Sequence, residues 1–295
     1  MQVLAFPESV EPARKLAQAL NVSFDTVELH RFPDGESLLT LPDKIAKTVI
    51  FFRSLHDPNA KLVELMLALE TARANGCKRA ILIAPYLCYM RQDMAFKPGQ
   101  AISQRIIGAR LSEWVDDLIT VDPHLHRISQ LSDALPYCNS VTATASLAIG
   151  NHLRTHGVHG LLVGPDEESA QWVEQVAKQA GLDFVIASKQ RFGDRDVKVT
   201  LPEAEVRGRQ AILVDDVISS GRTMIETASA LQQAGAKGVS AICTHALFAP
   251  GAFDDMRAAG CDPILSTDSI PHATNGIDLT PVLVDALREL IGEPR

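Results

Sequence analysis

Short runs of apolar and β-branched residues alternate along this chain with longer segments whose apolar residues recur at helical spacing. In the first half, residues 48–54, 79–86 and 116–122 predict buried strands, and residues 61–76 and 103–114 predict helices. Because strands and helices alternate, the pattern predicts parallel sheets covered by helices on both faces, which is the arrangement of an α/β protein.

The same alternation returns in the second half of the chain. The expected elements there are helices at 168–180 and 222–234 and strands at 160–166, 184–188, 211–216 and 239–247. Residues 72–87 also resemble residues 232–247, since each segment reads as a helix end, a glycine and then a strand. We therefore expect two similar α/β domains, at 1–145 and 146–295. The polar segment 191–208 is expected to be an excursion or hairpin beside a site.

Composition narrows the class of protein. The chain has 295 residues, of which 46% are apolar and 22% charged, and this suits two globular domains rather than a disordered or low-complexity chain. No apolar run predicts a transmembrane helix, and the N-terminus lacks the pattern of a signal peptide. The five cysteines form no CxxC pair. We therefore expect neither a zinc site nor a disulfide framework, but reduced thiols in the cytoplasm.

Charge and missing motifs exclude further classes. A net charge of −8 disfavours nucleic acid as a partner, although a few lysines and arginines could still hold a small anionic ligand. The sequence contains no GxxxxGK[ST], HExxH or GxSxG motif, and no GxGxxG motif follows a strand. These absences argue against a P-loop kinase and a dinucleotide-binding Rossmann site.

The strongest chemical signal lies where the apolar strand at 211–216 ends in Asp215 and Asp216. The next residues, VISSGRT (217–223), lead directly into a helix, and ligands of parallel sheets bind where strands end. The hydroxyls, the glycine and the helix N-terminus suit a phosphate, whereas the two carboxylates suit sugar hydroxyls or a metal. This combination predicts a phosphorylated ribose. The alternative is a serine and threonine helix cap beside two solvated aspartates.

The segment DDVISSGRT (215–223) resembles the phosphoribosyl-binding loop of the type I phosphoribosyltransferase fold. The resemblance implies that ribose 5-phosphate is bound by seven residues of this loop, namely Asp215, Asp216, Ser219, Ser220, Gly221, Arg222 and Thr223. The loop alone does not distinguish the transferases, which consume phosphoribosyl pyrophosphate, from the enzymes that make it.

Further segments make that distinction, because in order and spacing they resemble the ribose-phosphate pyrophosphokinase family. They are RFPDGES (31–37), APYLCYMRQD (84–93), KPGQAIS (97–103), TVDPHLH (120–126) and GPDEES (164–169). The resemblance implies two tandem type I phosphoribosyltransferase-like domains, with the ATP side in 1–145 and the ribose 5-phosphate loop in 146–295. It also implies transfer of the diphosphoryl group of Mg-ATP to the 1-hydroxyl of ribose 5-phosphate, which yields phosphoribosyl pyrophosphate and AMP.

The resemblance assigns ATP binding to two segments, through Phe32, Asp34, Glu36, Arg91 and Gln92. The loop around Phe32 would reach the ATP of a neighbouring subunit, so the resemblance implies a homo-oligomer, a dimer or higher. Arginine suits phosphate because its planar fork binds two oxygens. Considered without the resemblance, FPDGE is a plain turn and RQD a solvated turn.

The cofactor that the resemblance implies is Mg²⁺, with His124 and Asp166 at its site and Asp122 placed to assist. Because Mg²⁺ prefers oxygen ligands, His124 could instead be a strand-end histidine satisfied by hydrogen bonds. Lys189 and Arg191 match the family's catalytic cations at the root of a flexible loop, and alternation along an extended chain places both on one side. The alternative for this pair is two solvated charges.

Three positions depart from the family pattern. Ser219 stands where an aspartate is common, Glu168 where a glycine is usual, and Met94 where a basic residue is usual. We still expect activity, because the acidic pair and the cationic pair are both present. Two other functions stay open, which are a phosphoribosyltransferase that uses phosphoribosyl pyrophosphate and a catalytically silent regulatory homologue.

Overall fold

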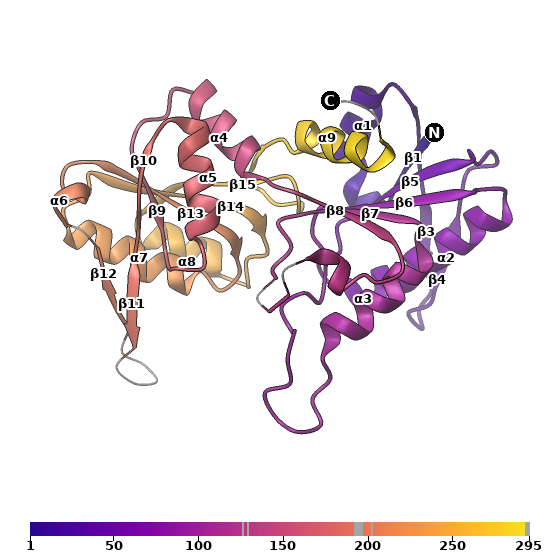
Figure 1. Cartoon of the computed structure of the whole chain (residues 1–295), viewed down its shortest axis with the longest axis horizontal. Coiled ribbons are helices and arrows are strands. Elements are labelled where there is room, and N and C mark those ends of the chain that lie inside the picture. Colours follow the sequence, from indigo (N-terminus) through magenta and orange to yellow (C-terminus); the bar gives the residue numbers. More distant parts are fainter. Residues whose placement is uncertain (126, 129, 192–196, 202, 293–295) are drawn as a thin grey trace. The chain divides into compact units, whose positions relative to one another are not determined.

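The computed structural model describes residues 1–125, 127–128, 130–191, 197–201 and 203–292. The chain divides into two compact units, each built around its own parallel sheet (Figure 1). Unit 1 contains Met1–Ala143 and Thr280–Arg295, and unit 2 contains Thr144–Leu279. Within the described ranges, no helix is long and apolar enough to cross a membrane.

The sheet of unit 1 is built from β1 (Gln2–Ala5), β2 (Ser23–Thr26), β5 (Thr48–Phe52), β6 (Arg79–Ala84), β7 (Asp117–Val121) and β8 (Asn139–Ala143). All neighbours are parallel, in the order β2-β1-β5-β6-β7-β8. The central strands are almost entirely buried, as expected for apolar strands covered on both faces. The three strands that the sequence predicted in this half are confirmed as β5, β6 and β7.

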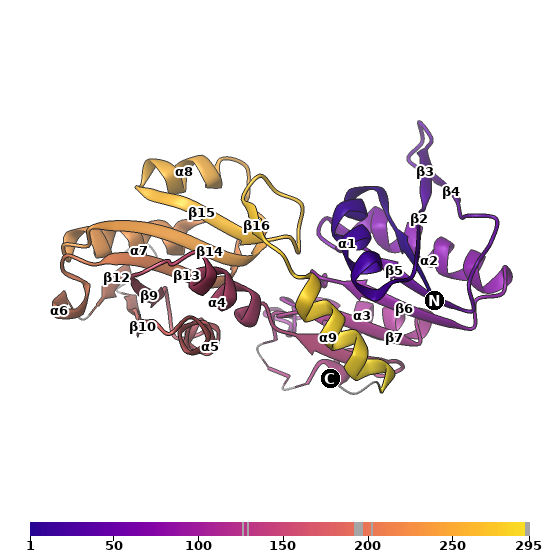
Figure 2. The same cartoon turned by 90° about the horizontal axis from the view of Figure 1, so that it is seen from above.

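The helices of unit 1 are α1 (Val10–Leu20), α2 (Pro58–Ala74), α3 (Ser103–Trp114) and α9 (Thr280–Ile291). The predicted helices at 61–76 and 103–114 are confirmed as α2 and α3. An antiparallel hairpin, β3 (Glu28–Arg31) with β4 (Ser37–Thr40), projects away from the sheet (Figure 2). Its Pro-Asp-Gly sequence predicted only the turn at its tip.

The last helix, α9, belongs to unit 1 and not to the second half of the chain. It packs against α1, β7 and β8 and lies beside α1 in Figure 1. Its buried face consists of Leu283, Val284, Ala286 and Leu287. The sequence analysis expected residues 146–295 to form the second domain, but the structure places this helix in unit 1. An apolar helix face can be buried by strands that are remote in the sequence.

The sheet of unit 2 is built from β9 (Leu161–Gly164), β10 (Asp183–Ile186), β13 (Gln210–Ile218), β14 (Gly238–Ala246), β15 (Cys261–Thr267) and β16 (Asn275–Ile277). Its order is β10-β9-β13-β14-β15-β16, again with parallel neighbours. The two sheets thus repeat one strand order. The similar segments 72–87 and 232–247 occupy equivalent places, leading from α2 into β6 and from α7 (Arg222–Gln233) into β14.

The other helices of unit 2 are α4 (Ser146–Thr155), α5 (Ala170–Ala180), α6 (Glu203–Val206) and α8 (Ala252–Ala258). The predicted helices at 168–180 and 222–234 correspond to α5 and α7. The segment expected as an excursion forms an antiparallel hairpin of β11 (Ser188–Arg191) with β12 (Val197–Thr200). This hairpin lies outside the parallel sheet, as the polar sequence predicted.

The amino ends of three strands of unit 1 are joined by one buried carboxylate, that of Asp117 on β7. Arg79 on β6 donates two hydrogen bonds to it, at 2.6 and 3.0 Å, and the side-chain amide of Asn139 on β8 donates a third at 3.0 Å. The Asp117 side chain is only 1% exposed. Such paired and hydrogen-bonded buried charge is costly to disturb, because removing one partner leaves the other desolvated.

We predict that Leu287→Ala lowers the free energy of unfolding by about 2–5 kcal/mol, because it removes a fully buried side chain and leaves a cavity between α9 and the sheet. Urea unfolding followed by circular dichroism measures the change. Asp285→Ala, on the exposed face of the same helix, is the control and should change stability by less than about 0.5 kcal/mol. Similar losses for both variants would contradict docking through Leu287.

Candidate active site

The predicted ribose-phosphate loop lies at the carboxyl edge of the sheet of unit 2. Strand β13 continues through Ile218, so Asp215 and Asp216 lie inside the strand rather than at its end as the sequence predicted. The Asp216 side chain is buried and that of Asp215 half-buried. Helix α7 begins at Arg222, which places its free backbone N–H groups directly behind the loop.

The loop is held from the neighbouring strand. The segment that follows β14 donates three backbone hydrogen bonds to it, from Leu247 and Phe248 to the carbonyl of Ile218 at 3.1 and 3.0 Å and from Ala249 to that of Ser219 at 2.9 Å. Ser219 and Thr223 are half-buried, and Ser220 is exposed. The hydroxyls of the loop are therefore presented from a backbone that is fixed on one side.

Gly221 is required at its position for two reasons. Its φ of +71° lies in the left-handed region, and it is the N-cap residue of α7. A Cβ atom there would also lie 3.0 Å from Cγ and 3.1 Å from Sδ of Met256, a fully buried residue on α8. The sequence suggested the first reason, but Met256 is 35 positions further along the chain and no local pattern pointed to it.

Three carboxylates gather at this edge. Asp166 follows β9, the strand paired with β13, and its side chain accepts a hydrogen bond from the backbone of Ser169 at 3.2 Å. Burial raises the pKa of Asp215 well above its usual value, and the charges of Asp216 and Asp166 raise it further. A cation or hydrogen-bond donors would therefore stabilise the ionised form of this cluster.

Within the described part of the chain, no three histidine, cysteine, aspartate or glutamate side chains are arranged to hold a metal ion. Mg²⁺ usually takes one or two carboxylates and completes its shell with water and substrate phosphates, so the chemistry of the Asp166 carboxylate is suited to it. Of the two predicted metal residues, Asp166 lies in unit 2 and His124 in unit 1. They therefore do not form one site within a single unit.

In unit 1 the predicted ATP residues Arg91 and Gln92 follow β6, and His124 follows the adjacent strand β7. The side chain of Arg91 is exposed and makes no hydrogen bond or ion pair to another described residue. The half-buried His124 lies two residues after Asp122, whose φ is +37° and whose backbone N–H donates to the carbonyl of Ala143 at 3.0 Å. The structure thus brings these two predicted segments to one edge.

The start of α3 holds the turn that carries Arg91 and Gln92. Gln104 donates a side-chain hydrogen bond to the carbonyl of Met90 at 2.9 Å, and its backbone N–H donates to that of Gln92 at 3.1 Å. Ser103 donates to the side-chain oxygen of Gln92 at 3.2 Å. The RQD triplet is therefore an ordered turn rather than the solvated one that the residues alone would suggest.

The remaining ATP residues lie on the β3–β4 hairpin. The backbone N–H of Phe32 donates to the carbonyl of Glu36 at 2.8 Å, and that of Gly35 donates to the carbonyl of Phe32 at 2.9 Å, which closes the predicted turn. The Phe32 side chain is 42% exposed, and Asp34 and Glu36 are exposed as well. Because the hairpin projects from unit 1 (Figure 2), these three side chains are presented to solvent.

The predicted catalytic cations lie on the other hairpin, at the end of unit 2's β11. Lys189 pairs with Val199 and Arg191 with Val197 on β12, so the two cations occupy alternate positions on one face. Their side chains, and the whole of residues 192–196, lie outside what the structure describes. That the side chains of Lys189 and Arg191 point toward the site therefore remains a prediction.

The equivalent edge of unit 1 is occupied by a buried ion-pair network that sequence reasoning missed. Arg53 follows β5, the counterpart of β13, and is 2% exposed. Its guanidinium pairs with Glu64 and, at 2.8 Å, with Glu8, and it stacks 3.9 Å above the ring of Phe6. Burial alone would raise the pKa of Glu8, but Arg53 and Lys61 lower it below its usual value.

Because the charge of Arg53 is already neutralised, this edge of unit 1 is not available for a phosphate between β1 and β5. The two sheets thus share a strand order but carry different chemistry at the same place, which is acidic in unit 2 and an arginine paired with glutamates in unit 1. The only signal in the sequence was a single arginine after the apolar run TVIFF.

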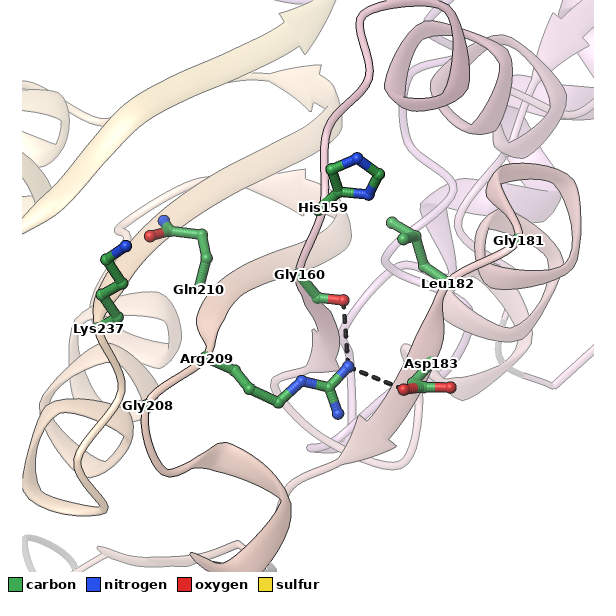
Figure 3. Close-up of a pocket in the computed structure, with 9 residues that line it drawn as sticks. All are labelled: His159, Gly160, Gly181, Leu182, Asp183, Gly208, Arg209, Gln210 and Lys237. Atoms are coloured by element: carbon green, nitrogen blue, oxygen red, sulfur yellow. Dashed lines mark hydrogen bonds and ion pairs between the residues drawn. The ribbon is translucent and has the colours of Figure 1, made fainter.

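A pocket of about 480 Å³ lies at the opposite, amino edge of unit 2 (Figure 3). Arg209 points into it and donates to the carboxylate of Asp183 at 2.8 Å and to the carbonyl of Gly160 at 3.4 Å. Gly181, which ends α5, also lines it. The pocket therefore lies at the opposite edge of the sheet from the predicted ribose-phosphate loop.

Comparison with known proteins agrees with this geometry. Residues 1–114 match the family model of the N-terminal domain of ribose phosphate pyrophosphokinase, and residues 139–278 match that of the phosphoribosyl transferase domain. A solved structure, phosphoribosylpyrophosphate synthetase from Mycobacterium smegmatis, superposes with a TM-score of 0.83 at 21% identity and covers 99% of this chain and 98% of its own. This likeness confirms the fold expected for both units.

Named relatives match over nearly their full length. The chain is 36% identical over 295 residues to a ribose-phosphate pyrophosphokinase of Methanopyrus kandleri, covering 99% of this chain and 100% of the relative. It is 30% identical over 286 residues to ribose-phosphate pyrophosphokinase 2 of Archaeoglobus fulgidus, covering 97% and 99%. The resemblance found in the motifs is thereby confirmed, and the chain belongs to the ribose-phosphate pyrophosphokinase family.

Proposed function

We propose that this protein is an enzyme that transfers the diphosphoryl group of Mg-ATP to the 1-hydroxyl of ribose 5-phosphate, in the cytoplasm. The products are phosphoribosyl pyrophosphate and AMP. The observation that carries the proposal is the carboxyl edge of unit 2, where buried and half-buried carboxylates, loop hydroxyls and a helix N-terminus occur together. These groups suit the hydroxyls and the phosphate of one phosphorylated sugar.

Ribose 5-phosphate occupies the loop 215–223 in this proposal. Ser219, Ser220 and Thr223, with the N-terminus of α7, bind the 5-phosphate, while Arg222 adds positive charge at the start of the helix. Asp215 and Asp216 accept hydrogen bonds from the ribose hydroxyls. The fixed backbone of the loop limits the conformational entropy that is lost on binding.

ATP binds at the carboxyl edge of unit 1. The exposed Arg91 and the ordered Gln92 contact the nucleotide, and Arg91 supplies a planar donor fork to its phosphates. The exposed Phe32, Asp34 and Glu36 fit contacts to the adenine of a neighbouring subunit, with the ring stacking on the base and a carboxylate accepting an amine hydrogen. The active protein is then a homo-oligomer, a dimer or higher.

The reaction breaks the bond between the α-phosphate oxygen and the β-phosphorus of ATP and forms one between that phosphorus and the 1-oxygen of the sugar. AMP leaves, and the hydroxyl proton is released. Asp166 in unit 2 and His124 in unit 1 would each contribute to binding Mg²⁺ in its own unit, and the ion would supply positive charge to the phosphate oxygens. Lys189 and Arg191 neutralise charge that develops on the transferred group, and closing of their hairpin excludes water.

Lys189→Ala should lower kcat by about 100- to 1,000-fold with little change in either KM, because its charge acts in the transition state. Phosphorus NMR of the protein with ATP, Mg²⁺ and ribose 5-phosphate measures AMP and the new diphosphate. Lys198→Ala is the matched control, since Lys198 pairs with Gln190 on the other face of the same hairpin. It should retain nearly full activity.

The same experiment separates the alternatives. A phosphoribosyltransferase would release no AMP from ATP and would need a base or another acceptor. A silent homologue would bind ribose 5-phosphate without turnover in the unsubstituted protein. A loss of ribose 5-phosphate affinity in Lys189→Ala, equal to its loss of kcat, would assign Lys189 to binding.

Asp215→Asn should abolish turnover but raise the melting temperature at pH 8 by a few degrees. Because the pKa of Asp215 is raised in the folded protein, its ionised carboxylate lowers stability above that pKa. This loss disappears as the pH falls through the raised pKa, so the stabilising effect of the variant should shrink toward pH 4. Differential scanning calorimetry between pH 4 and 8 measures it. Glu226→Gln, an exposed position on α7, should show no such trend.

Gly221→Ala should weaken ribose 5-phosphate binding by about 10-fold or more, because the added Cβ meets Met256 and the left-handed φ is strained. Isothermal titration calorimetry measures the dissociation constant. Gly208→Ala is the control, since φ there is +76° but no atom lies within 4 Å of the added Cβ. It should cost similar backbone strain yet leave binding unchanged; weakened binding in this control would refute a local effect at Gly221.

A further inference from the structure

An ion pair joins two segments of unit 1 that the proposed ATP site uses. Arg127 donates from Nη1 to Oδ1 of Asp93 at 2.6 Å. The Asp93 side chain is 1% exposed, whereas that of Arg127 is 53% exposed. The carboxylate is thus withdrawn from water while the guanidinium keeps most of its hydration, so the pair is far more important to Asp93 than to Arg127.

Arg127 supplies the counter-charge that the buried carboxylate of Asp93 needs. The second oxygen of Asp93, Oδ2, is buried and has no hydrogen-bond partner in the described part of the chain. A buried carboxylate without a counter-charge is strongly disfavoured, since neither water nor protein replaces its lost hydration. If Arg127 is removed, the turn that carries Asp93 must therefore open to hydrate the carboxylate.

The pair spans the place where the two ATP segments meet. Asp93 directly follows Gln92, and Arg127 follows His124 by three residues. The strands that precede them, β6 and β7, are hydrogen-bonded neighbours, with Ala84 opposite Thr120. The first turn of α3 holds Met90 and Gln92 from one side, and Arg127 is the described residue that holds Asp93 from the other.

We infer that Arg127 is a positioning residue for ATP, and this inference rests on the proposed function. Its guanidinium fixes Asp93 and so sets the place of the Arg91–Gln92 turn relative to the His124 segment. Both segments then face the same nucleotide phosphates. Because Arg127 is largely exposed, removing its side chain leaves no core cavity, and the effect falls on the geometry of the turn rather than on the packing of the unit.

Arg127→Gln is the central variant, since it keeps a hydrogen-bond donor but removes the charge. We expect the KM for ATP to rise by about 10-fold or more, as for the loss of one charged hydrogen bond, while the KM for ribose 5-phosphate stays within about twofold. Arg127→Lys should recover part of the ATP affinity. The melting temperature should fall, because the buried Asp93 carboxylate loses its counter-charge, but a role in stability alone would raise both KM values equally.

Asp93→Asn provides a second, independent readout. A neutral side chain no longer needs a counter-charge, so adding Arg127→Gln to Asp93→Asn should raise the KM for ATP much less than it does in the unsubstituted protein.

Arg110→Gln is the matched control, because Arg110 is an exposed arginine of unit 1 whose ion pair with Glu113 lies along α3. It should change both KM values by less than about twofold. An unchanged KM for ATP in Arg127→Gln, or additive effects in the double variant, would overturn the inference. So would an equal rise of both KM values with a lowered melting temperature.

Failure of the proposed function gives a different result. In that case the unsubstituted protein releases no AMP from ATP and ribose 5-phosphate. Calorimetric titration of the protein with Mg-ATP still tests Arg127, because it measures nucleotide binding without turnover. Weaker binding in Arg127→Gln than in Arg110→Gln supports the positioning role, and equal binding by the two variants contradicts it.

Discussion

Parallel pairing is the constraint on which both candidate sites depend, because it sends the carboxyl ends of all strands in a sheet to one edge. Residues that are remote in the sequence meet there. Asp166 follows β9, Asp215 lies near the carboxyl end of the paired strand β13, and the charge of Asp166 contributes to the raised pKa of Asp215. The same rule brings the RQD turn and His124 to one edge in unit 1, since β6 and β7 are neighbours.

The two units show how one strand order supports two kinds of chemistry. Between β9 and β13 the edge of unit 2 holds carboxylates that a cation or a polyol would stabilise. Between β1 and β5 the corresponding edge of unit 1 is filled by Arg53, with Glu8 and Glu64 as its partners. The charge of Arg53 is paired within the protein and contributes to structure, whereas the raised pKa of Asp215 marks a carboxylate whose ionised form a ligand would stabilise.

Buried carboxylates are therefore compensated to different degrees at the different sheet edges. At the amino edge of unit 1, Asp117 is satisfied by arginine and asparagine donors and links three strands. At the carboxyl edges, Asp215 is ionised only at a cost and Asp93 is half-satisfied by one exposed arginine. Buried groups that lack full compensation are expected where a protein binds or transforms a ligand, because the ligand supplies the missing interactions.

The sequence by itself determined the alternating elements, the β11–β12 excursion and the chemistry of the loop 215–223, because periodicity and turn residues act over short stretches of chain. It also indicated the family through motifs that lie within single loops. Only the tertiary structure decided that α9 packs on unit 1, that Met256 lies against Gly221, that Arg53 is internally paired and that Arg127 holds Asp93. These contacts join residues far apart in the chain, and no local pattern encodes such pairing.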